Sequence, residues 1–177
     1  MVPRLSAHPA LGEPARASEV NDIYMPRPDW DTYGIMLAKS VASRADCTRR
    51  QVGAVLMASD HSIVSTGYNG GPSKGFSCLQ GECPRGRLSH DQLPADSPYD
   101  TGGGSCVALH AEWNVLLRSS WADMVDGTLY VTEEPCHICK VLISGTKIAR
   151  VVFPGNVWNP GTDRQMSETA ARSIFPL

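Results

Sequence analysis

The sequence lacks the long apolar runs, the charge excess and the leader pattern that mark membrane, nucleic-acid-binding and secreted proteins. No apolar run reaches the ~18 residues that a transmembrane helix needs, so no membrane association is expected. The formal net charge is −2 and the pI about 6.2, which argues against binding of extended nucleic acid. The N-terminus shows no basic segment followed by an apolar one, so a cytoplasmic location is expected.

Internal repeats are also absent, and the 177 residues favour one domain. Hydrophobic residues make up 42% of the chain, which is enough for a real core. Residues 1–25 are rich in proline and alanine without a sustained period, and they are predicted to form a flexible N-terminal arm. Residues 26–177 are predicted to form a single domain.

Six cysteines are present, and without a secretory signal they favour metal sites over disulfides. The most informative stretches are His110-Ala111-Glu112 and Pro135-Cys136-His137-Ile138-Cys139, with 25 residues between His110 and Cys136. Read together as H-x-E and P-C-x-x-C, they match the signature of zinc-dependent base deaminases.

The chemistry of such a site needs these residue types. His110, Cys136 and Cys139 supply one imidazole and two thiolates to a zinc ion, and they leave a fourth position for water, whose pKa the metal lowers. Glu112 is then placed to move protons between that water and the substrate. The competing interpretation is a closed structural zinc site, but that would normally need a fourth protein ligand.

Hydrophobic periodicity predicts the order α-β-β-α-β-α-β, an α/β layered sheet with both motifs at helix starts on the same edge. A long connection rich in glycine and proline, residues 70–105, follows the second strand. The tail is predicted to hold a short helix near residues 167–174. Helices are expected at 29–44, 110–119 and 136–144, and strands at 51–57, 62–68, 128–132 and 148–153.

From Arg27 to about Gly155 the chain resembles the deoxycytidylate (dCMP) deaminase branch of the cytidine/deoxycytidylate deaminase superfamily. The stretches that carry the resemblance are RPDWDTY, CTRRQVGAVL, STGYNGGPSKG, ALHAEWNVLL, GTLYVTEEPCHICKVLI and GTKIARVVF. It implies a three-layer α/β fold with a mixed sheet of about five strands between helices. It also implies hydrolysis of dCMP to dUMP and ammonia, a homo-oligomer with a hexamer favoured, and dCTP as an effector.

The resemblance also implies substrate contacts. Asn69 matches a position near the sugar and base, although a turn residue before two glycines is the plainer interpretation. Groups around Ala111, Thr132, Glu134 and Pro135 are expected to contact the amine and ring edge. The phosphate needs a cation, and the basic residues beside matching motifs are Arg49 and Arg50, with Arg44 and Lys74 as further candidates; a solvated basic run is the alternative.

Four cysteines lie outside the catalytic motif. Because some bacterial and phage members of the family carry a second, structural zinc in this region, these four are candidate ligands for one, and His90 could replace one of them. The alternative is four independent buried cysteines. The residues are Cys47, Cys78, Cys83 and Cys106.

Two other functions stay open at the level of the sequence. The same chemistry fits another cytosine nucleotide or nucleoside (modified dCMP, CMP or deoxycytidine) or adenosine in tRNA. The second alternative function is a zinc-binding module without turnover, and the presence of Glu112 argues against it. Trp113 departs from the family pattern and is expected to pack, whereas Arg118 is expected to enter the pocket or a subunit contact.

Overall fold

The computed structural model describes residues 26–95, 97 and 106–162, and every structural statement below refers to them. The predicted arm of residues 1–25 and the predicted helix near residues 167–174 lie outside these ranges. A search of the described helices finds none with the length and apolar character needed to span a membrane.

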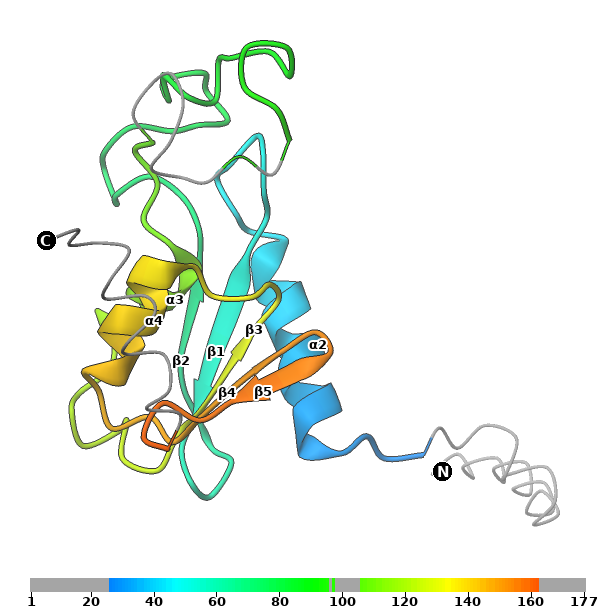
Figure 1. Cartoon of the computed structure of the whole chain (residues 1–177), viewed down its shortest axis with the longest axis vertical. Coiled ribbons are helices and arrows are strands. Elements are labelled where there is room, and N and C mark those ends of the chain that lie inside the picture. Colours follow the sequence, from blue (N-terminus) through cyan, green and yellow to red (C-terminus); the bar gives the residue numbers. More distant parts are fainter. Residues whose placement is uncertain (1–25, 96, 98–105, 163–177) are drawn as a thin grey trace, which may run out of the picture.

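A mixed sheet of five strands forms the centre of the molecule (Figure 1). Its order is β2-β1-β3-β4-β5, and only the β3–β4 pair is parallel. The strands are β1 (Gly53–Met57), β2 (Ile63–Tyr68), β3 (Thr128–Val131), β4 (Arg150–Phe153) and β5 (Asn156–Trp158). The predicted fold class, a mixed sheet of about five strands between helices, is confirmed.

The helix α2 (Trp30–Ala42) covers one face of the sheet, and α3 (Ala111–Leu116) and α4 (His137–Ser144) cover the other (Figure 1). Strand β1 is buried on both sides, so its successive side chains enter two separate cores. Ala54 and Leu56 pack with α3 and α4, whereas Val55 and Met57 pack with α2. This alternation produces the three layers.

Helix α2 begins where the side chain of Asp29 accepts a hydrogen bond from the Thr32 amide, at 2.7 Å. Its buried face carries only small residues, Gly34, Ala38 and Ala42, spaced four apart. The helix therefore lies close to the sheet: a Cβ added at Gly34 would be 2.5 Å from the Tyr130 ring.

The last strand was not recognised from the hydrophobic pattern. β5 folds back on β4 through a tight turn in which Gly155 has φ of 77°, a conformation that favours glycine. The asparagine, proline and glycine residues of this segment are therefore the residues of a hairpin.

The described residues of the connection between β2 and α3 extend beyond one end of the sheet (Figure 1). Its two ends are held together, because the backbones of Gly70 and Leu109 exchange hydrogen bonds of 3.1 and 2.7 Å. This bridge places His110 beside the end of β2, at the same edge as the start of α4.

Candidate metal centre and substrate pocket

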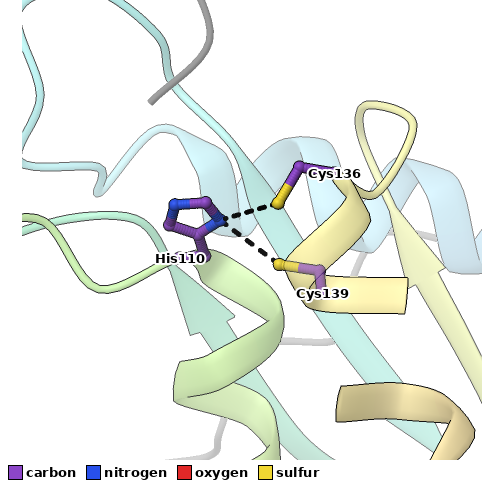
Figure 2. Close-up of side chains that lie close together, drawn as sticks. All are labelled: His110, Cys136 and Cys139. Carbon is purple, nitrogen blue, oxygen red and sulfur yellow. Dashed lines mark hydrogen bonds between the residues drawn. The ribbon is translucent and has the colours of Figure 1, made fainter. Parts of the chain in front are cut away.

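Three side chains converge where α3 and α4 begin (Figure 2). His110 and Cys136 occupy the N-cap positions of the two helices in extended backbone conformations, and Cys139 lies one turn into α4. The side chains of these two residues approach each other, with the Nδ1 atom of His110 3.5 Å from the Cys136 sulfur. Both are therefore directed toward each other, as the predicted motif at helix starts requires.

The distances approach those of a tetrahedral metal site. The Nδ1 atom of His110 lies 3.2 Å from the Cys139 sulfur and 3.5 Å from the Cys136 sulfur. Zinc–nitrogen and zinc–sulfur bond lengths imply ligand separations of about 3.5–3.8 Å in a tetrahedral site. Within the described part of the chain, this is the only group of three or more His, Cys, Asp or Glu side chains whose possible ligand atoms all lie within 4.8 Å of one another.

The two thiols of this site differ in acidity. The hydrogen bond from the Cys139 thiol, with a smaller contribution from His110, lowers the pKa of Cys136 to about 4. The same bond, together with burial and the Glu112 carboxylate, raises the pKa of Cys139. One sulfur is thus already a thiolate near neutral pH, which is the form that binds metals.

Glu112 is buried beside these ligands, with 4% of its surface exposed. Burial raises the pKa of its carboxyl group, and the nearby Cys136 thiolate adds to the effect. A carboxyl whose pKa is raised toward neutrality can both accept and return a proton.

A pocket opens over this group. Among the residues predicted to contact substrate, Asn69, Ala111, Glu134 and Arg50 line it. Thr132 and Pro135 are not among its lining residues; the Thr132 hydroxyl accepts a hydrogen bond from the Gly53 amide at 3.1 Å. The full lining is Arg50, Val52, Asn69, His110, Ala111, Glu112, Glu133, Glu134 and Cys136.

Asn69 is 1% exposed and forms part of the pocket wall. Its side-chain oxygen accepts from the Val52 amide at 2.8 Å, and its nitrogen donates to the Arg50 carbonyl at 2.9 Å. The amide group carries two hydrogens, so one donor is left after the bond to Arg50. The turn interpretation is therefore incomplete, because this side chain connects Val52, just before β1, with the Arg50 backbone and lines the pocket.

The two adjacent arginines have different surroundings. The Arg49 guanidinium donates to the carbonyls of Leu88, Leu93 and Pro94, at 3.3, 2.6 and 3.1 Å, and so holds the long connection against the domain. Arg50 lines the catalytic pocket and lies 3.7 Å from Glu133. Of the other candidates, Arg44 and Lys74 are exposed and are not among the pocket-lining residues.

The four remaining cysteines line one small, separate pocket. Their sulfurs do not form a set within 4.8 Å, unlike the group around His110. They nevertheless accept backbone hydrogen bonds: the amides of Thr48, Arg49 and Gly86 donate to sulfurs at 3.3–3.4 Å. His90 is exposed and is not among the residues that line this pocket.

Two functional candidates were missed by the sequence reasoning. Glu133 was not singled out, although it directly precedes Glu134 in the motif. Trp113 was expected only to pack, yet its ring stacks on His110 with centroids 4.6 Å apart and planes 12° apart. Their spacing of three residues on a helix was the available signal. Arg118, by contrast, is exposed and donates to the Asn114 carbonyl at 3.1 Å.

Residues 28–154 match the family model described as the cytidine and deoxycytidylate deaminase zinc-binding region. The deoxycytidylate deaminase of Mycobacterium phage D29 is 47% identical over 130 residues, 73% of this chain and 98% of the phage protein. That of Saccharomyces cerevisiae is 37% identical over 72% of this chain, which spans only 38% of the yeast protein. The dCMP deaminase of cyanophage S-TIM5, solved with dCMP and dUMP, has a TM-score of 0.52 at 24% identity, with 73% and 83% of the chains covered. This last likeness concerns the fold.

Proposed function

Because the chain belongs to the cytidine and deoxycytidylate deaminase family, we propose that it hydrolyses dCMP to dUMP and ammonia in the pocket above His110. The observation that carries the proposal is the buried Glu112 carboxyl beside one imidazole and two thiols. The identity to the phage D29 enzyme, over almost its whole length, favours dCMP as the substrate.

His110, Cys136 and Cys139 are the residues that would hold the zinc ion, and their donor atoms and spacing suit it. Zinc supplies Lewis acidity at this position, which makes water a nucleophile near neutral pH. Cys136 caps α4 and Cys139 lies in its first turn, where the helix dipole favours negative sulfur.

Glu112 moves the protons of the reaction. Its carboxylate takes a proton from the attacking water and delivers it to N3 of the pyrimidine. The second proton goes to the 4-amino group, which leaves as ammonia while the water oxygen stays on C4. Burial suits this role, because it excludes bulk water and raises the pKa of the carboxyl group, which favours return of the proton.

Asn69 and Arg50 orient the nucleotide. The remaining amide hydrogen of Asn69 is the group offered to the sugar or base edge. Arg50 binds the 5′-phosphate, whereas Arg49 is a structural residue whose guanidinium holds loop carbonyls. The Arg50 backbone is fixed from both sides, since its carbonyl meets Asn69 and its amide lies 3.5 Å from the Cys47 sulfur.

The test is ammonia release by the purified protein on dCMP, CMP, 5-substituted dCMP, deoxycytidine and a tRNA. Preference for dCMP, abolished in Glu112→Gln, supports the proposal. Preference for another substrate overturns the substrate assignment and keeps the site. A zinc-loaded protein that is inactive on all five overturns the catalytic assignment.

A second zinc ion at Cys47, Cys78, Cys83 and Cys106 is also proposed. Amides that donate to cysteine sulfurs stabilise thiolates, and two guanidinium groups, Arg49 and the 4%-exposed Arg85, line the same pocket. Four thiolates and Zn²⁺ carry a net charge of −2, which two arginines balance.

Three predictions from the sequence analysis were not tested by the structure. The homo-oligomer, with a hexamer favoured, the dCTP effector and the cytoplasmic location stay predictions. Size measurement with and without dCTP addresses the first two directly.

A further inference from the structure

Trp113 lies on the first turn of α3, three residues after His110, and the two rings are nearly parallel. The indole also packs against the core cluster between the sheet and the helices α3 and α4. Its Nε1 atom is buried and has no hydrogen-bond partner among the described residues. A buried, unpaired N–H group costs free energy, so an aliphatic side chain would fill this volume at lower cost.

The orientation of the His110 imidazole decides whether it can bind the metal. His110 is the N-cap of α3 and has an extended backbone conformation. Its Nδ1 atom must face the sulfurs of Cys136 and Cys139 (Figure 2). A ring stacked on the imidazole face restricts rotation out of this orientation.

We propose that Trp113 is a positioning residue that strengthens zinc binding by stacking on His110. The inference rests on the proposed zinc site. An imidazole that donates its electron pair to Zn²⁺ becomes more positive, and the face of an indole ring attracts positive charge more strongly than other aromatic faces do. The stack therefore stabilises the zinc-bound form of His110 more than the free form, which raises zinc affinity.

The experiment follows the transfer of zinc from the zinc-loaded full chain to a chromophoric chelator at equilibrium. The variants are Trp113→Phe, which keeps an aromatic face, and Trp113→Leu, which removes it. Trp158→Phe is the matched control, because Trp158 belongs to the same core cluster and also has a buried, unpaired Nε1. His110→Ala identifies which zinc belongs to this site.

The dissociation constant for zinc is expected to rise by about 10- to 100-fold in Trp113→Leu, the range found for residues that support metal ligands. Trp113→Phe should show a rise of only a few-fold, and Trp158→Phe none. The melting temperature of each zinc-free variant separates this effect from packing. If Trp113→Leu fails to fold, the contrast between Trp113→Phe and Trp158→Phe decides.

Equal zinc affinity in the wild type and both Trp113 variants overturns the inference alone. The inference is also overturned if Trp158→Phe lowers the zinc affinity as much as Trp113→Phe does, because general core packing would then explain both losses. If the wild-type protein binds no more zinc than His110→Ala does, the proposed zinc site is overturned as well.

Discussion

Substitution of Arg50 by alanine separates phosphate recognition from catalysis. The guanidinium lines the pocket that holds Glu112, and its side chain is 27% exposed. Hydrogen bonds between charged groups contribute about 1.5–3 kcal/mol. Because 1.36 kcal/mol corresponds to tenfold in rate, kcat/KM for dCMP should fall by about 10- to 150-fold.

The position of Glu133 places the expected loss toward the upper end of that range. Its carboxylate lies 3.7 Å from Arg50 in the wild type. Without the arginine, this negative charge stays at the pocket and repels the incoming phosphate. Glu133→Gln should therefore restore part of the lost activity in the double variant.

The assay is initial-rate ammonia release on dCMP and deoxycytidine in parallel. Deoxycytidine has no phosphate, so its kcat/KM should change by less than about threefold, well under the effect of one charged hydrogen bond. Arg44→Ala is the matched control, because it removes the same charge from an exposed position outside the pocket. Equal losses on the two substrates would refute phosphate binding by Arg50 and assign it a structural role.

Three further outcomes are expected. Glu112→Gln should lower kcat by about 10²- to 10⁴-fold through loss of the proton carrier, with bound zinc and melting temperature unchanged. Gly34→Ala should destabilise the fold by about 1–3 kcal/mol in chemical denaturation, because the new Cβ meets the Tyr130 ring; Gly161→Ala, with open space around it, should not. Cys78→Ser should lower the zinc content from two ions per chain to one by metal analysis, and an unchanged content would contradict the second site.

The catalytic centre could be predicted because its residues are grouped in short local motifs. His110 and Glu112 belong to one helix start, and Cys136 and Cys139 to another. Helix starts give strong local signals, and only one long-range fact, that both starts share an edge of the sheet, had to be inferred. The order of strands and helices supplied that fact.

The fifth strand could not be predicted in the same way. β5 has three residues, Asn156–Trp158, which is too short for an alternating pattern to be read. Its conformation depends on pairing with β4, for example of Val151 with Trp158. This pairing cannot be read from the local sequence.

The different surroundings of two adjacent arginines were the hardest feature to predict from the sequence. Arg49 and Arg50 have the same chemistry and adjacent positions, so their sequence context predicts the same role for both. Their surroundings differ because the chain turns between the Cys47 sulfur, which accepts from both backbone amides, and Asn69, which donates to the Arg50 carbonyl. Arg49 is thereby directed to the long connection, and Arg50 to the pocket. The placement of Arg50 at the pocket thus depends on the backbone conformation of residues 47–50, which hydrogen bonds to the Cys47 sulfur help to fix.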